Sequence, residues 1–237
     1  MPTSQAPHTL KDFDVELENA SDLLLQMGAR VERQVQDAVE CLAGGSRSLV
    51  EQVLRHEWDI NELERRIDEL ASQIIARRQP AAGDLRLLTA VLKTTTDLER
   101  IGDEAKKIAL LARKIHSDGG PRVPRRTELR AMAKIAAGML HAALAAFERL
   151  DIQGIADVVR RDAEVNEDFR AILRQLITYM IEDPRTITAS LDLVLVAKAL
   201  ERIGDHGKNI ASHVIYAAKG ADVRHATLAE LEQEVRS

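Results

Sequence analysis

The feature that most constrains this chain is an internal duplication. Residues 99–109 read ERIGDEAKKIA and residues 201–211 read ERIGDHGKNIA, and the two segments agree at eight of eleven positions. A weaker pair precedes them in the same order, VEQVLRHEWDINELER at 50–65 and IADVVRRDAEVNEDFR at 155–170. Because two landmarks recur in the same order at nearly the same offset, the chain is expected to fold as two copies of one unit.

The hydrophobic spacing within each unit is helical. In the first unit, apolar residues recur every three or four positions at Leu98, Ile101, Ala105, Ile108 and Ala112, which is the period of one helix face. We expect three helices per unit, at about 10–41, 48–79 and 84–117 and then at 125–150, 153–182 and 184–219, with a short C-terminal helix near 226–235. Short loops favour antiparallel packing. The predicted fold is all-α: two tandem repeated three-helix bundles, residues 1–118 and 119–222, in an elongated molecule with a C-terminal tail, 223–237.

Local signals predict where the helices begin and end. Ser48 with Glu51 is typical of a capping box, and Asp84 is a candidate N-cap. Asp183, followed by a proline, predicts another helix start, and Gly220 predicts the end of that helix. The densest Gly/Pro segment, 118–124, is the expected seam between the two units.

Composition excludes several classes of function. The chain has 237 residues, a net charge of −5 and only six aromatic residues, so it lacks the charge and the stacking surfaces of a nucleic-acid binder. Its single cysteine, Cys41, cannot form an internal disulfide. No signal peptide or long unbroken apolar segment is evident. We therefore expect a cytoplasmic protein with no nucleic-acid partner.

The duplicated motif carries the most suggestive chemistry. Each copy has two carboxylates four residues apart, Glu99 and Asp103 in the first copy and Glu201 and Asp205 in the second. Like charges at that spacing weaken a helix, and the mid-helix glycines Gly102 and Gly204 cost up to about 1 kcal/mol each. Both unfavourable choices are duplicated. They predict a carboxylate site for hard cations such as iron, manganese, magnesium or calcium, rather than structural zinc.

An ordinary ion-pair ladder on a solvated face uses the same residue types. Arg100 and Lys106 flank the first acidic pair, and Arg202 and Lys208 repeat the arrangement around the second. Exposed charge runs of this kind are common on helices and contribute little to stability. This alternative stays open at the level of sequence.

The repeated segments, extended to LERIGDEAKKIA and LERIGDHGKNIA, resemble the paired E(D)xxxD motifs of the PhoU family of phosphate-transport regulators. Three further segments agree in order along the chain: ARRQPAAGDLR at 76–86, TYMIEDPRTI at 178–187 and KGADVRH at 219–225. The resemblance covers residues 13 to 225. It implies two three-helix bundles, a metal-binding face, and a negative regulator of phosphate uptake and of the phosphate-starvation response.

The resemblance also implies partners and ligands. The partners would be the ATP-binding subunit of a phosphate ABC transporter and a sensor histidine kinase, with the protein a homodimer peripheral to these membrane complexes. The implied metal residues are Glu99, Asp103, Glu201 and Asp205, with iron the first expectation and zinc, manganese, magnesium or calcium as alternatives. By its position on the same helix stripe, four residues after Asp205, Asn209 is a further candidate ligand through its carbonyl oxygen.

Some neighbours of the motifs depart from the repeat. Lys107 stands where the second copy has Asn209, so the first site is expected to be weaker or differently coordinated. Asp97 has no acidic counterpart and is at most an accessory. His206 points about 100° away from Asp205 around the helix and is expected to be exposed or interfacial. Further candidates on the second helix of each unit, with a solvated face as the alternative, are Asp59, Asn61, Glu164 and Asn166.

Catalysis finds little support in the sequence. No histidine lies three residues after either motif glutamate, unlike the Glu-x-x-His of di-iron bundle oxidases, and no phosphate-cradling glycine loop, GxSxG or HExxH occurs. We therefore expect a regulator that works by binding and is not an enzyme. The rival interpretations are a ferritin-like di-metal enzyme and a metal-free helical scaffold.

Overall fold

The computed structural model describes residues 6–117, 126–224 and 226–236. The described chain is built of helices: α1 (Ala6–Gly44), α2 (Arg47–Arg78), α3 (Ala82–Ser117), α4 (Arg126–Arg149), α5 (Ile155–Glu182), α6 (Ile187–Lys219) and α7 (Leu228–Arg236), with a short 3₁₀ turn at Pro184–Thr186 before α6. The all-α prediction is confirmed. The expected seam at 118–124 lies outside the described residues.

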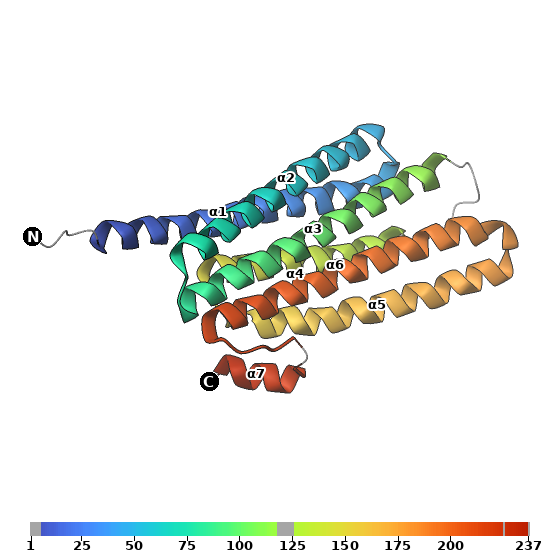
Figure 1. Ribbon diagram of the computed structural model, residues 1–237. Coiled ribbons are helices and arrows are strands. Elements are labelled where there is room, and N and C mark those ends of the chain that lie inside the picture. The colour runs from blue at the N-terminus through green and yellow to red at the C-terminus, as the bar shows by residue number, and fades with distance from the viewer. Residues whose placement is uncertain (1–5, 118–125, 225, 237) are drawn as a thin grey trace, which may run out of the picture.

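Six long helices form two three-helix units that lie side by side (Figure 1). Helices α1, α2 and α3 pack on one another, as do α4, α5 and α6. The units are joined mainly by α3 against α6 and, less extensively, by α1 against α4, while α7 rests on α5. The two helices that carry the repeated motif are therefore neighbours at the centre of the molecule, and α2 and α5 flank them on the outside.

Glycines let α1 and α6 approach α4 closely. A Cβ added to Gly207 of α6 would lie 3.5 Å from the backbone nitrogen of Leu140 in α4, and one added to Gly28 of α1 would lie 2.8 Å from the side chain of Leu144. The core itself is aliphatic, with Leu98, Ile101, Ala105, Ile108 and Ala112 of the predicted stripe all fully or almost fully buried. Interiors of this kind are packed as densely as organic crystals.

The predicted helix ends meet mixed outcomes. Gly220 ends α6 in a left-handed conformation with φ 80°, as predicted. Asp183 accepts a hydrogen bond from the backbone N–H of Arg185 as an N-cap, but it caps the 3₁₀ turn that precedes α6, and Thr186 is the N-cap residue of α6 itself. The capping box at Ser48 and Glu51 is wrong, because α2 begins at Arg47, whose side chain pairs with Glu51. Asp84 lies in the first turn of α3 rather than at its N-cap.

One described helix is long and apolar enough to cross a bilayer by length and composition. The segment is Thr127–Arg149 of α4, with a mean hydropathy of 1.2 over its most apolar window, half of which is buried among the other helices. Core helices of proteins that never enter a membrane pass the same test.

The turn between α1 and α2 depends on Gly45. Its φ is 61°, and an added Cβ would lie 2.5 Å from the Cβ of His116 at the end of α3. We expect Gly45→Ala to lower the free energy of unfolding by at least about 1–2 kcal/mol, since a left-handed conformation is strained for a residue with a Cβ and His116 must also move. Gly83→Ala is the matched control, because nothing lies within 4 Å of that position; it should be neutral or slightly stabilising. Urea denaturation of both variants measures this, and equal stabilities would refute the role of Gly45.

Two carboxylate clusters and a buried aspartate between the repeats

The first predicted acidic pair lies against carboxylates of the neighbouring helix. The pKa of Glu99 on α3 is raised by burial, then by the nearby carboxylates of Asp103 on the same helix and of Glu64 and Glu57 on α2, with Arg100 acting in the opposite direction. The pKa of Glu64 is raised as well, by burial and by Asp68 and Asp103. These groups therefore share one site, in which burial and the neighbouring negative charges disfavour the ionised forms of Glu99 and Glu64.

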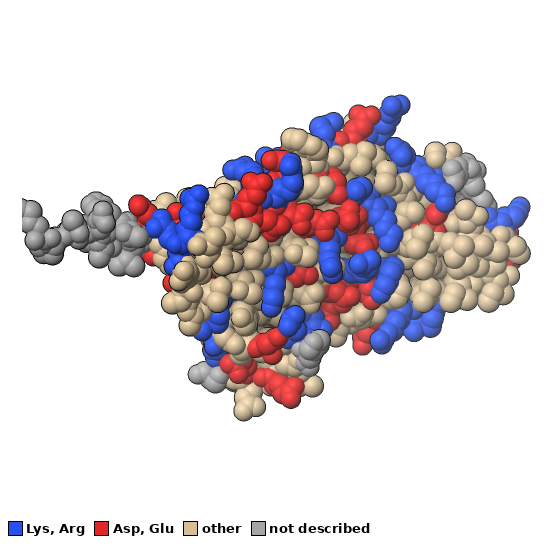
Figure 2. Space-filling view, in the orientation of Figure 1, with Lys and Arg blue, Asp and Glu red and all other residues tan. Residues whose placement is uncertain are grey.

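The second pair repeats this arrangement. The pKa of Asp205 on α6 is raised by burial, then by Glu201 and by Asp162 of α5. Glu201 is largely buried and is paired with Lys198 at 2.6 Å. Figure 2 shows both clusters on one face of the molecule, with red side chains gathered over α2 and α3 and again over α5 and α6, and blue side chains between them.

A lysine reaches over each cluster from an equivalent position of the repeat. Lys106 Nζ lies 3.1 Å from Glu57 Oε1 and 3.2 Å from Asp103 Oδ1. Lys208 Nζ lies 2.9 Å from Asp162 Oδ2. Glu57 and Asp162 occupy matching places in the weaker repeat at 50–65 and 155–170, so the duplication preserved an ion pair between the second and third helix of each unit.

The second-helix candidates expected from the sequence lie elsewhere. Asp59 pairs with Arg30 of α1 at 2.7 Å, and the amide nitrogen of Asn166 bonds to the carbonyl oxygen of Asp162 in its own helix. Asn61 and Glu164 are exposed. The residues that complete the clusters are instead Glu57, Glu64 and Asp162. Their signal was present in the sequence, since Glu57 and Asp162 are acidic counterparts at the same offset.

Carboxylate oxygens of this kind are the ligands that hard cations prefer, but in the described residues they are not arranged around one point. No group of three or more His, Cys, Asp or Glu side chains in the described ranges is arranged to hold a metal ion. Yet each cluster contains a buried oxygen with no hydrogen-bond partner, Gln34 Oε1 in the first and Asp162 Oδ1 in the second. A Cβ on Gly102 would lie 3.0 Å from Gln34 Oε1 and 3.5 Å from Glu57 Oε2. The glycine thus lets polar oxygens approach the backbone of α3.

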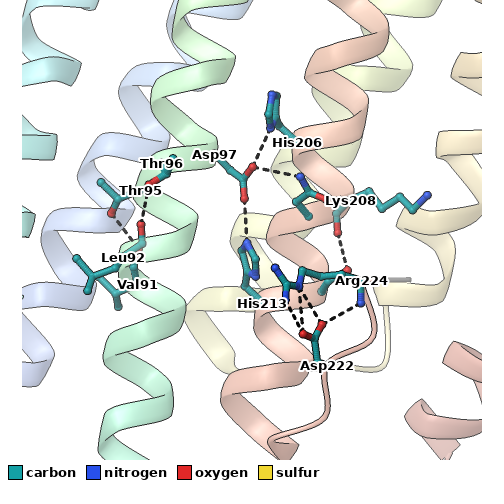
Figure 3. Close-up of polar contacts among 12 residues, drawn as sticks. Val91, Leu92, Thr95, Thr96, Asp97, His206, Lys208, His213, Asp222 and Arg224 are labelled. Carbon is teal, nitrogen blue, oxygen red and sulfur yellow. Dashed lines mark hydrogen bonds and ion pairs between the residues drawn. The ribbon is translucent and has the colours of Figure 1, made fainter. Parts of the chain in front are cut away.

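A third polar site was missed by sequence reasoning and lies where α3 meets α6. Asp97 Oδ1 is 2.7 Å from His206 Nδ1 and accepts a hydrogen bond from Asn209 Nδ2 at 3.2 Å, and Asp97 Oδ2 is 2.9 Å from His213 Nε2. Figure 3 shows Asp97 on α3 reaching between the two imidazoles of α6. Asp97, His206 and His213 are buried. Burial by itself raises the pKa of Asp97. The hydrogen bonds from His206, His213 and Asn209 have the larger combined effect, and the pKa is lowered to about 2.

These contacts involve two of the three positions at which the motif copies differ. The predicted ligand Asn209 has its amide nitrogen on Asp97, and His206 is interfacial, one of its two expected environments. Glu104, the counterpart of His206, pairs with Arg202 across the same contact at 2.8 Å and with Lys107 at 3.4 Å. Lys107 is therefore engaged outside the first carboxylate cluster. Two of the differing pairs, Glu104/His206 and Lys107/Asn209, therefore include a residue at the contact between the units. The third, Ala105/Gly207, differs for another reason, since Gly207 packs against Leu140 of α4 in its own unit.

Replacing Asp97 should weaken the contact between the units in a pH-dependent way. The folded-state pKa of Asp97 is below its ordinary value of 3.8, so the charged form stabilises the fold above about pH 4, and this contribution is lost as the pH falls toward 2. We expect Asp97→Asn to lose about 2 kcal/mol of unfolding free energy at pH 7 and less at pH 3, measured by urea denaturation.

The control for that experiment is Asp157→Asn. Asp157 is exposed and pairs only with Arg160 of its own helix in the described structure, so its replacement should change stability by less than about 0.5 kcal/mol. A loss for Asp97→Asn that is the same at pH 7 and at pH 3 would contradict the charge-based account.

Comparison with known proteins identifies the family. The PhoU domain model matches residues 24–112 and 129–214. Curated relatives include a "Phosphate-specific transport system accessory protein PhoU homolog" from Burkholderia sp, 46% identical and covering 96% of this chain and 97% of that one. A second homolog, from Pseudomonas aeruginosa, is 43% identical and covers 97% and 95%. The Escherichia coli K12 accessory protein PhoU is 38% identical over 95% and 93%.

Solved structures agree with this assignment. The crystal structure of PhoU from Pseudomonas aeruginosa superposes with a TM-score of 0.84 at 44% identity, covering 88% of this chain and all of that one. PhoU from Streptococcus pneumoniae superposes with a TM-score of 0.81 at 23% identity, over 89% of this chain and 99% of that one, and it supports the fold. The chain belongs to the PhoU family, whose members are regulatory accessory proteins and not enzymes.

Proposed function

We propose that this protein is a negative regulator of phosphate uptake and of the phosphate-starvation response, acting in the cytoplasm by binding partner proteins. Its coarser role, as a regulatory accessory protein in phosphate transport, follows from the family. The finer proposal names two partners, the ATP-binding subunit of a phosphate ABC transporter and a sensor histidine kinase, and a homodimer as the working form. The observation that supports this proposal is a face with two carboxylate clusters, one formed by α2 and α3 and the other by α5 and α6.

The clusters are proposed metal sites. Glu99 and Asp103 would bind in the first and Glu201 and Asp205 in the second, joined by the neighbouring carboxylates of α2 and α5. Asn209 would contribute only its carbonyl oxygen, because its nitrogen is held by Asp97. Raised carboxylate pKa values and the unpartnered oxygens of Gln34 and Asp162 support this assignment. Iron, manganese, magnesium and calcium suit such oxygen donors, and zinc is retained as an alternative.

This chain's own residues decide what binding a cation does to the surface. In the absence of a cation, Lys106 and Lys208 neutralise part of the negative charge of the clusters. A bound divalent or trivalent ion would supply the positive charge instead and release those lysines toward solvent. The surface offered to a partner would then change both its charge pattern and its rigidity, and docking to charged partner faces depends on such complementarity.

Metal content tests the site. We expect protein purified without added metal to carry ions that are lost in Glu99→Gln/Asp103→Asn and in Glu201→Gln/Asp205→Asn, because each double variant removes two carboxylate ligands; elemental analysis measures the load. The matched control is Glu18→Gln/Asp22→Asn, an exposed acidic pair with the same spacing on α1. If wild type and all variants carry the same load, or none, the metal-free scaffold is the better account.

Reporter output tests the regulatory role. Deleting the gene in its host should raise expression from a phosphate-starvation promoter in phosphate-rich medium, by tenfold or more if the protein holds a kinase silent, since about 1.4 kcal/mol of coupling corresponds to a tenfold change. Complementation with wild type should restore repression. A deletion strain that remains repressed would defeat this proposal.

A further inference from the structure

A groove lies where the first part of α1 meets the beginning of α3 and the end of α4. It shares no residue with the carboxylate clusters. It encloses about 430 Å³, within the range of sites that take small ligands. Its apolar walls come from three helices: Leu17 and Leu25 of α1, Leu87 of α3 and Phe147 of α4. Leu17 and Phe147 are buried, so the floor belongs to the core.

The polar residues at the groove are almost all acidic. Asp14, Glu18 and Asp22 follow one another at four-residue spacing along α1, and Glu148 faces them from α4. None of the residues that line the groove is basic, and these four carboxylates make no ion pair within the described chain. By contrast, Glu16 of the same helix is held by two nitrogens of Arg78 at 2.9 and 3.0 Å. Successive like charges at this spacing each weaken a helix by a few tenths of a kcal/mol.

Leu150, which lines the groove, has a strained backbone conformation. Leu150 ends α4 with φ 48°, and the backbone N–H of Asp151 bonds to the carbonyl of Ala146 at 3.0 Å, the pattern of a helix end at which glycine is usual. A left-handed leucine costs about 1–2 kcal/mol. Yet the Leu150 side chain stays 41% exposed, so the fold regains little from burying it. Such a departure from local preference is typical of binding surfaces.

We propose that this groove docks a basic amphipathic segment of a partner protein. Apolar side chains of the segment would pack on Phe147 and Leu150, and its flanking lysines or arginines would pair with the carboxylates of α1 and with Glu148. Helices that lay an apolar face into a groove are a common mode of peptide recognition. The single sign of the rim selects a cationic partner and disfavours an anionic membrane surface. The inference goes beyond the proposed function, because it requires neither the metal nor the acidic motifs.

Peptide binding to the full-length protein tests the charge complementarity. The probe is a fluorescein-labelled 18-residue helical peptide with leucine and phenylalanine on one face and lysines on its flanks, followed by anisotropy. We expect Asp14→Asn/Glu18→Gln/Asp22→Asn to weaken binding about tenfold. The control Glu69→Gln/Glu167→Gln/Glu182→Gln changes exposed acids elsewhere by the same net charge and should change affinity less than about twofold. Equal losses in both triple variants would show attraction by net charge alone and overturn the proposal.

Leu150→Gly separates docking from folding. Glycine relieves the left-handed conformation, so the unfolding temperature should stay level or rise, while peptide affinity should fall about fivefold or more through loss of an apolar contact. Unchanged affinity would overturn the groove as the site. Glu99→Gln/Asp103→Asn should bind the peptide as wild type does, which keeps this test independent of the metal proposal.

Two other occupants are outcomes of the same study. Binding to vesicles of phosphatidylserine and phosphatidylcholine that is lost in Leu150→Gly would identify a membrane rather than a protein segment. Self-association, followed by sedimentation, that is lost in Leu150→Gly would identify a second copy of this chain. Either result would overturn the proposed occupant.

Discussion

The contact between α3 and α6 is the interaction on which the rest of the molecule depends. At its centre a single carboxylate, Asp97, satisfies two imidazoles and an amide of the other repeat. A buried ion of this kind is expensive to desolvate, and it is tolerated because its oxygens receive several hydrogen bonds. By fixing the two motif helices beside each other, the contact places both carboxylate clusters on one face instead of on opposite ends of an extended chain.

Duplication explains both what is repeated and what is not. When two copies of one helix pack together, equivalent side chains can come close to each other, and two aspartates or two glutamates cannot share a buried site without a cation or a proton. The chain resolves this by divergence: Glu104 faces Arg202, and Asp97 faces His206. Away from this contact no such conflict exists. The ion pairs of Lys106 with Glu57 and Lys208 with Asp162 could therefore remain the same in both units.

Sequence reasoning predicted the periodic and repeated features and missed those that depend on packing. Spacing and local chemistry predict the number of helices and the chain breaks at Asp183 and Gly220. They also predict which motif residues share a helix face. Ser48 with Glu51 met the pattern of a capping box, but α2 starts earlier and Arg47 takes the glutamate. Asp97 was undervalued because it has no acidic counterpart, although a charged residue present in only one copy is what an asymmetric contact between copies requires. Which second-helix carboxylates join each cluster depends on helix rotation, which periodicity alone does not set.

The lysines over the clusters have a consequence for how the surface responds to its surroundings. Lys106 and Lys208 are tethered competitors, present at a high local concentration however dilute the solution. A cation at the proposed metal sites would have to displace them, which would lower its apparent affinity by a constant factor set by the chain itself. Each acidic cluster already has an internal counterion in the fold itself, so no external cation is needed to offset its charge. Under the proposed function, the duplicated ion pair would make folding of the bundle independent of metal binding at its face.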